Sequence, residues 1–273
     1  MQNSEVRNKS KQDTASFTGT PLQLIHTNFT SFLDSPERPF GQYTDDTQMT
    51  LALTESLVEC GCIDGQHCAT TYAQFWKNPP LRGYGPAVTN ILKALLHGAN
   101  YKMTATMVYP EGSYANGGVM RIAPVGLAFR HASLDTLHQA VVSALLCTHV
   151  HPEAIDGAFL QVKICEKPQN DLKAYAVSQL SQMKPESFDA IALVKDLLSK
   201  AKTDIIRQKL TYILDKSADK EIQDIQIVLQ LTEPNQFGKQ FQIRSSEALA
   251  CALWSLIRYL PDNYPYLPVQ LWI

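Results

Sequence analysis

The chain has 273 residues, of which 45% are hydrophobic and 18% charged, a composition typical of a globular protein of one or two domains. Its 24 lysines and arginines against 26 aspartates and glutamates leave a net charge of −2. The chain therefore lacks the basic surplus of a nucleic-acid-binding protein or of a polybasic membrane anchor.

No apolar run approaches the length of a membrane helix, and the N-terminal residues lack the apolar core of a secretory signal peptide. Six cysteines in a chain of this length do not form a disulfide scaffold and favour a reducing compartment. We therefore expect an intracellular protein, cytoplasmic, nuclear or both, with a mitochondrial location also open.

Residues 1–40 are polar and aperiodic, which predicts a poorly ordered lead-in. Beyond them, apolar residues recur at three- and four-residue steps, the spacing of one face of an α-helix. Residues at the ends of these stretches support the assignment, since Gly61 and Gly98 end helices and Ser133 precedes one as an N-cap. The predicted helices cover approximately residues 45–60, 86–98, 133–148, 154–166, 188–200, 205–214, 222–231 and 246–260.

No segment with the alternating pattern of a strand competes with these helices, and no internal repeat is present. The prolines that follow Leu260 prevent the tail from being helical throughout. We predict an all-α fold with one helical domain at residues 41–260, between the lead-in at 1–40 and a proline-rich tail at 261–273.

A polar cluster, Tyr43–Thr47, stands at the start of the first predicted helix and contains the acidic turn Thr44–Asp46. The two carboxylates and two threonine hydroxyls of the cluster are hard oxygen ligands of the kind that Mg²⁺ or Ca²⁺ prefers. The alternative is helix capping, because Asp and Thr are favoured N-caps and Asp45 with Gln48 has the spacing of a capping box. Acidic residues in a first helical turn also suit the helix dipole.

A glycine-rich polar loop, residues 111–118, precedes an apolar stretch from Val119 that we predict to be helical. Glycines let backbone N–H groups approach a ligand closely, and a following helix N-terminus favours a phosphate. The loop has neither the Gly-Lys-Ser/Thr ending of a Walker A loop nor the spacing of a dinucleotide fingerprint. The alternative is a purely structural turn.

A pair of histidines, His149 and His151, follows the third predicted helix, with Glu153 nearby. Such a group can bind a transition metal or transfer protons. The alternative is a helix C-terminus, where histidine is favoured by the carbonyl ends.

Three cysteines and a histidine lie within nine residues: Cys60, Cys62, His67 and Cys68. Their spacing fits no common structural zinc site, so we interpret these cysteines as buried thiols.

Four motifs occur in a specific order along the chain: Y-T-D-D-T-x-M at Tyr43–Met49, R-G-Y-G at Arg82–Gly85, G-S-Y-x-N-G-G-x-M-R at Gly112–Arg121, and T-H-x(7)-G-A-x-L-Q at Thr148–Gln161. This series resembles the ADP-ribosylhydrolase (ADP-ribosylglycohydrolase) family, and it is most similar to the branch that acts on serine-linked ADP-ribose and O-acetyl-ADP-ribose. The resemblance implies an orthogonal all-α fold and a centre with two Mg²⁺ ions.

The resemblance also implies roles for individual residues. Thr44, Asp45 and Asp46 match metal ligands, and Asp45 would in addition face the terminal ribose. The residues that match substrate-binding positions, on the loop around the diphosphate and after it, are Glu111, Gly112, Ser113, Tyr114, Ala115, Asn116, Gly117 and His149.

Two family motifs do not occur in this sequence: the N-terminal motif with a catalytic acidic residue and the C-terminal G-G-D-T-D-T motif. The only Gly-Gly pair is Gly117-Gly118. We therefore assign no general acid or base, expect at most a partial Mg²⁺ site, and interpret the helical domain as truncated at both ends.

The resemblance predicts a Mg²⁺-dependent glycosidase-type hydrolase, whose competence in this form stays open. Its expected partner is ADP-ribose or an ADP-ribosylated protein, without nucleic-acid or membrane binding, and we expect a monomer. The alternative is a non-catalytic ADP-ribose-binding or structural member of the family.

Overall fold

The computed structural model describes residues 43–80, 82–165, 189–219, 222–234 and 243–259. The chain divides into two units between Tyr43 and Thr44, and the description below concerns the second. The predicted lead-in at 1–40 and the predicted tail at 261–273 lie outside the described residues. Within those residues, no helix is both long enough and apolar enough to cross a membrane.

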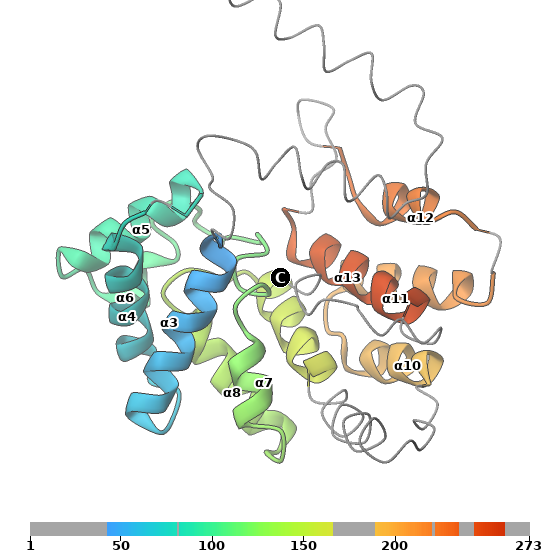
Figure 1. Ribbon diagram of the computed structural model, residues 1–273, viewed down its shortest axis with the longest axis horizontal. Coiled ribbons are helices and arrows are strands. Elements are labelled where there is room, and N and C mark those ends of the chain that lie inside the picture. Colours follow the sequence, from blue (N-terminus) through green and yellow to red (C-terminus); the bar gives the residue numbers. More distant parts are fainter. Residues whose placement is uncertain (1–42, 81, 166–188, 220–221, 235–242, 260–273) are drawn as a thin grey trace, which may run out of the picture. The chain divides into compact units, whose positions relative to one another are not determined.

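The described part of the chain is helical and contains no strand, which confirms the predicted all-α class (Figure 1). Ala115 and Arg244 form an isolated antiparallel bridge. A further helical segment occupies residues 152–165. The helices are α3 (Asp45–Cys60), α4 (Gly65–Lys77), α5 (Pro86–Leu96), α6 (Tyr101–Thr104), α7 (Ala123–Ala128), α8 (Leu134–Leu145), α10 (Ala190–Lys200), α11 (Asp204–Lys216), α12 (Asp224–Leu231) and α13 (Ser245–Tyr259).

The local signals at helix ends act as predicted. Gly61 ends α3 in the left-handed conformation, with φ of 65°, and its N–H donates to the Leu57 carbonyl. The Ser133 side chain accepts a hydrogen bond from the backbone N–H of Thr136 at the start of α8.

The apolar stretch after the glycine-rich loop is helical only from Ala123, so the prediction of a helix from Val119 is wrong. Pro124 lies in the first turn of α7, where its missing N–H costs no hydrogen bond. Residues 117–121 instead follow turns. α7 begins only at Ala123 and has six residues, so no helix N-terminus follows the loop directly, as the phosphate argument assumed.

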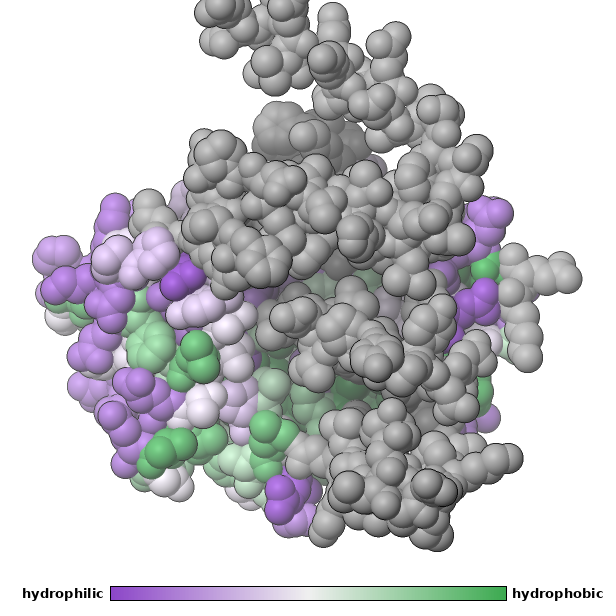
Figure 2. Space-filling view, in the orientation of Figure 1, coloured by the Kyte–Doolittle hydropathy of each residue, from purple (hydrophilic) through white to green (hydrophobic). Residues whose placement is uncertain are grey.

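The core joins helices from the whole described unit. α3 packs between α4 and α7, and α11 packs against α10 and α13 (Figure 1). The segment 152–165 contacts both groups. A Cβ atom at Gly126 of α7 would lie 3.1 Å from the Val162 carbonyl oxygen, and the buried Asp156 carboxylate accepts hydrogen bonds from the Lys202 and Thr203 N–H groups at the start of α11. Figure 2 shows mainly hydrophilic side chains along the outer side of α4 and α5.

Candidate functional site

The acidic turn at the start of α3 does not serve as a helix cap through its side chains. Thr44 is the N-cap residue, yet its hydroxyl makes no capping bond and instead donates to Asp46 Oδ2 at 2.7 Å. The Gln48 amide donates to the Phe75 carbonyl at 3.0 Å and its oxygen accepts from the Tyr84 hydroxyl at 2.7 Å. The capping-box alternative for Asp45 and Gln48 is therefore wrong.

The donor chemistry of this turn fits a hard cation, since Thr44, Asp45 and Asp46 place one hydroxyl and two carboxylates on a single partly exposed turn. The Asp45 N–H donates to the Arg82 carbonyl at 3.0 Å, which brings the R-G-Y-G segment to the turn. Among the described residues, no group of three His, Cys, Asp or Glu side chains is arranged to hold a metal ion. The turn thus offers part of a metal site, and the metal role of its residues stays a prediction.

The loop at Glu111–Gly117 lies directly against residues 149–151. A Cβ atom at Gly112, where φ is 83°, would lie 2.7 Å from Val150 Cγ2 and 2.8 Å from the His151 nitrogen. A Cβ atom at Gly117 would lie 2.8 Å from Cε1 and 2.9 Å from Nε2 of His149. Both glycines are needed for this close approach, so two motifs that are distant in sequence form one site.

The same loop is fastened on its other side to residues 243–245. The Asn116 N–H donates to the Ile243 carbonyl at 2.7 Å, and the Ser245 N–H donates to the Tyr114 carbonyl at 2.9 Å. The Ser245 hydroxyl also donates to the Ala115 carbonyl at 2.8 Å. The backbone conformation of the loop is therefore set by contacts with two distant segments.

These contacts decide which loop N–H groups remain available to a ligand. The N–H groups of Gly112 and Asn116 already donate to backbone carbonyls, and the Ala115 N–H donates to Ser113 Oγ at 3.2 Å. These N–H groups are therefore occupied, so the expectation that the loop amides meet phosphate oxygens applies only to the remaining ones. Within the described residues, the loop N–H groups that donate to no backbone carbonyl include those of Ser113, Tyr114 and Gly117.

Arg244 covers the loop from the side of α13. Its guanidinium carbon lies 4.5 Å from the centre of the Tyr114 ring, and Glu153 holds it through N–O distances of 2.6 and 3.2 Å. The Ser246 hydroxyl donates to the same carboxylate at 2.7 Å. Burial by itself raises the pKa of the Glu153 carboxyl, but the hydrogen bonds from Arg244 and Ser246 more than offset it and hold this pKa below its usual value.

His149 and His151 make separate contacts with different residues. His149 is buried, and its Nδ1 lies 2.9 Å from the Thr148 hydroxyl. His151 Nδ1 accepts from the Glu153 N–H at 3.2 Å, and its ring meets Tyr114 edge-on at 5.9 Å. No metal-binding group of three includes them in the described part of the chain. The His-x-His metal hypothesis therefore gains no support.

The cysteine cluster is divided between core and surface. Cys68 is buried, whereas Cys62 is exposed and Cys60 is intermediate, so the interpretation as buried thiols holds for Cys68 alone. None of the six cysteines, which all fall within the described ranges, forms a disulfide.

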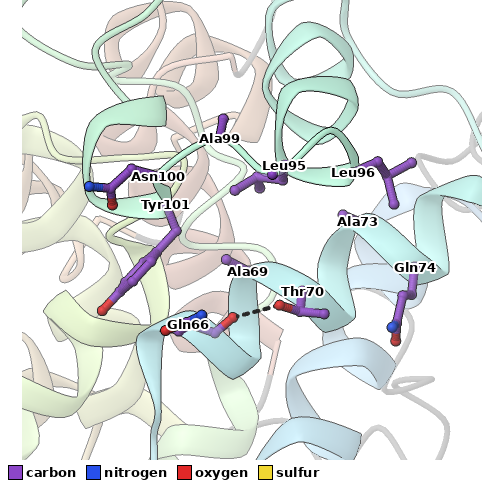
Figure 3. Close-up of a pocket in the computed structure, with 11 residues that line it drawn as sticks. Gln66, Ala69, Thr70, Ala73, Gln74, Leu95, Leu96, Ala99, Asn100 and Tyr101 are labelled. Atoms are coloured by element: carbon purple, nitrogen blue, oxygen red, sulfur yellow. Dashed lines mark hydrogen bonds between the residues drawn. The ribbon is translucent and has the colours of Figure 1, made fainter.

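A cavity of about 520 Å³ lies elsewhere, between α4 and the residues around α6 (Figure 3). Its lining contains no charged side chain and none of the predicted site residues, so it offers no cation to a diphosphate. The lining residues are Gln66, Ala69, Thr70, Ala73, Gln74, Leu95, Leu96, Gly98, Ala99, Asn100 and Tyr101.

Sequence reasoning assigned no role to Arg121, Arg244 or Ser245, which contact the loop. Arg121 has a recognisable signal, because an arginine inside an apolar stretch is a candidate for a buried group held by hydrogen bonds. Residues 238–246, which include Arg244 and Ser245, lie where the resembled family has another ligand-facing stretch, but no motif assigns a role to either residue. Their contacts with the loop join segments more than a hundred residues apart.

The chain is similar in sequence to known proteins. The family model described as ADP-ribosylglycohydrolase matches residues 5–268, a range that includes most of the segment 1–40. "ADP-ribosylhydrolase ARH3" of Mus musculus is 39% identical over 122 residues, which cover 44% of this chain and 32% of that protein. The Homo sapiens protein of the same name is 38% identical over 122 residues, or 44% of this chain and 33% of that protein.

A bacterial relative shows the same partial overlap. "ADP-ribosyl-[dinitrogen reductase] glycohydrolase" of Rhodospirillum rubrum is 34% identical over 112 residues, which cover 41% of this chain and 36% of that protein. The chain thus spans about a third of the length of the curated relatives that it matches. Because the family model covers nearly the whole chain, the chain belongs to the ADP-ribosylglycohydrolase family.

Proposed function

We propose that this protein binds ADP-ribose with its diphosphate on the Glu111–Gly117 loop and hydrolyses the bond between C1″ of the terminal ribose and an oxygen-linked acceptor. The acceptor is a serine side chain of a modified protein or the acetyl group of O-acetyl-ADP-ribose. One observation carries the proposal: two glycines seat the loop against residues 149–151 at distances that leave no room for a Cβ atom.

The binding role rests on groups that the fold leaves available. The N–H groups of Ser113, Tyr114 and Gly117 donate to no described backbone carbonyl, and the Ser113 hydroxyl proton is free to turn outward because its oxygen acts as the acceptor from Ala115. Backbone N–H groups in a preformed loop bind phosphate oxygens without the cost of ordering the chain. His149, which lies against Gly117, would contact the ligand beside these N–H groups.

The hydrolytic role rests on the acidic turn. Thr44, Asp45 and Asp46 would hold Mg²⁺ through oxygen atoms, and the ion supplies positive charge that stabilises developing negative charge. Asp45 would also orient the terminal ribose by accepting hydrogen bonds from its hydroxyl groups. Thr44 holds the Asp46 carboxylate in place through its 2.7 Å hydrogen bond.

Release of ADP-ribose from a serine-ADP-ribosylated peptide tests the proposal, with Mg²⁺ and with a chelator. We expect Asp45→Asn and Asp46→Asn each to slow release at least about 100-fold, since even outer contacts of metal sites account for about 10- to 100-fold. Asp135→Asn is the matched control, because Asp135 is an acid in the first turn of α8. Release that needs neither carboxylate would contradict the metal assignment.

A second function, ADP-ribose binding without hydrolysis, is favoured by one observation. The contacts that shape the loop come from residues 149–151 and 243–245, not from the acidic turn. ADP-ribose binding by a folded protein that releases nothing from the peptide would establish this alternative.

A further inference from the structure

Arg121 is a buried cation beneath the loop. It is fully buried, and its guanidinium donates to the Gly117 carbonyl at 3.1 Å, to the Ala144 carbonyl at 3.4 Å and to the Thr148 hydroxyl oxygen at 2.6 Å. Its carbon lies 4.4 Å from the centre of the Tyr72 ring. Arg121 therefore joins the end of the loop to the residue that precedes His149.

The hydrogen bonds around Thr148 determine where its hydroxyl proton points. Its oxygen accepts from Arg121, so the proton can go to Leu145 O at 3.4 Å, to His149 Nδ1 at 2.9 Å or to the sulfur of Cys147, which also hydrogen-bonds with Thr148. The Leu145 carbonyl already accepts the N–H groups of Thr148 and His149, both at 2.9 Å. A carbonyl has two lone pairs, so Leu145 O at 3.4 Å is the poorer acceptor, and the Cys147 thiol, which burial keeps protonated by raising its pKa to about 11, is a weak one. His149 Nδ1 is therefore the best acceptor for the hydroxyl proton.

A neutral imidazole that accepts at Nδ1 carries its proton on Nε2. Burial, and second the positive charge of Arg121, lower the pKa of His149 to about 3, which keeps the ring neutral at physiological pH. The Cε1–Nε2 edge faces Gly117. Within the described residues, the hydrogen bond with Thr148 is the one that the ring makes, so Nε2 remains available beside the loop.

We propose that Arg121 and Thr148 are positioning residues that fix His149 as the tautomer protonated on Nε2, so that His149 donates a hydrogen bond to an oxygen of the bound ADP-ribose. The inference rests on the proposed function for its ligand, whereas the tautomer is a property of the protein alone. Arg121 also links the loop to His149, because the guanidinium that bonds Thr148 donates to the Gly117 carbonyl as well.

Nitrogen NMR of the imidazole rings in the full, ligand-free chain tests the tautomer. His149→Gln identifies which signals belong to His149. We expect a protonated Nε2 and an unprotonated Nδ1 in the wild type and in Thr148→Ser, and loss of this preference in Thr148→Val. Thr71→Val is the control, since Thr71 is another buried threonine whose hydroxyl lies near a histidine. A wild-type His149 protonated on Nδ1 would overturn the inference.

Calorimetric titration with ADP-ribose tests the donor role with two nearly isosteric variants. His149→Gln keeps an N–H near the position of Nε2, whereas His149→Met is also uncharged and of similar length but offers no donor. We expect the Met variant to bind at least about tenfold more weakly than the Gln variant, the loss that follows from one buried hydrogen bond left unmade. Equal affinities, or tighter binding by the Met variant, would contradict the donor role.

The two experiments separate this inference from the proposed function. If the wild type binds no ADP-ribose, the proposed function and the donor role both fail, whereas the NMR result still decides the tautomer. If the wild type binds ADP-ribose and His149 is protonated on Nδ1, the proposed function stands and the inference falls.

Discussion

The Glu111–Gly117 loop and the Thr44–Asp46 turn are both candidate binding elements, but the fold holds them differently. The loop is fixed by residues 149–151 on one side and 243–245 on the other. In the turn, the Thr44 hydroxyl donates to Asp46 two residues away, and the Asp45 N–H donates to the Arg82 carbonyl of a more distant segment. Among the described residues, no third acidic, histidine or cysteine side chain completes a metal-binding group there.

This difference separates two steps of the proposed function. A loop fixed by distant segments is preorganised, so ligand binding pays little ordering cost. Among the described residues the acidic turn offers only part of a metal site, so a bound ion would complete the arrangement of its carboxylates. We therefore expect substitutions around the loop to change stability and affinity, and substitutions in the turn to change hydrolysis.

The largest expected effect on stability comes from Gly112→Ala. The new methyl group meets Val150 and His151 below 3 Å at a positive φ, which combines overpacking with backbone strain and costs about 3 kcal/mol of unfolding free energy. Gly98→Ala is the control, since Gly98 has φ of 83° but nothing within 4 Å of the added atom. Urea unfolding should show a smaller loss of unfolding free energy for Gly98→Ala, of about 1 kcal/mol. Equal losses in the two variants would mean that the loop shifts to make room for the methyl group at Gly112.

A smaller loss is expected when Glu153 can no longer hold Arg244. Because the Arg244 side chain is 28% exposed, we expect Glu153→Gln to cost about 2 kcal/mol rather than the larger loss of a fully buried pair. The pKa of Glu153 lies below its ordinary 4.5 in the folded protein. Its contribution is therefore complete above pH 4.5 and is lost as the pH falls through the folded-state pKa.

Unfolding of the Glu153→Gln variant and the wild type at neutral and acidic pH tests whether the stabilisation by Glu153 is lost in acid. The stability gap between them should narrow as the pH falls. Glu55→Gln, on the exposed side of α3, should leave stability unchanged at both pH values. A gap that widens in acid would contradict the assigned role of the carboxylate.

Thr44→Val distinguishes a ligand from a helix cap. Since Thr44 makes no capping bond and Asp46 stays partly exposed, we expect a stability loss of at most about 0.5 kcal/mol together with slower release of ADP-ribose. Asp64→Ala removes a true N-cap bond, from the His67 N–H at 2.8 Å, and should cost about 1 kcal/mol. Thermal unfolding and peptide turnover of both variants separate the two roles.

The smallest expected effect is that of pH on ADP-ribose affinity. With a pKa of about 3, His149 is neutral at every pH above about 4. Calorimetric affinities measured from about pH 5 to about pH 8 should therefore agree within about twofold. A change centred near the ordinary histidine pKa of 6.5 that disappears in His149→Gln would show that the ring does titrate.

Local signals predicted most of the described helices, because capping and periodicity act within a few residues, but none of the predicted ranges covers α4 or α6. Gly61 and Ser133 mark helix ends as expected. The error at Val119 arose because apolar composition alone does not separate a buried turn from a helix. Pro124 was the better marker of the helix start.

The candidate site was predicted in part. The family resemblance placed the glycine-rich loop and His149 in one substrate site, and the two are in contact in the structure. Arg244 and Ser245 escaped sequence reasoning, because their contacts with the loop depend on tertiary packing between remote segments. The metal and substrate roles of the acidic turn and the loop remain predictions.

The most direct test is calorimetric binding of ADP-ribose by the wild type, Gly117→Ala, Gly98→Ala and Asp46→Asn. We expect Gly117→Ala to weaken binding at least about tenfold, because the added methyl group displaces His149 from the loop. Gly98→Ala should bind as the wild type does, and Asp46→Asn should lose less affinity than Gly117→Ala. Wild-type affinity in Gly117→Ala together with lost binding in Asp46→Asn would contradict the assignment of binding to the loop.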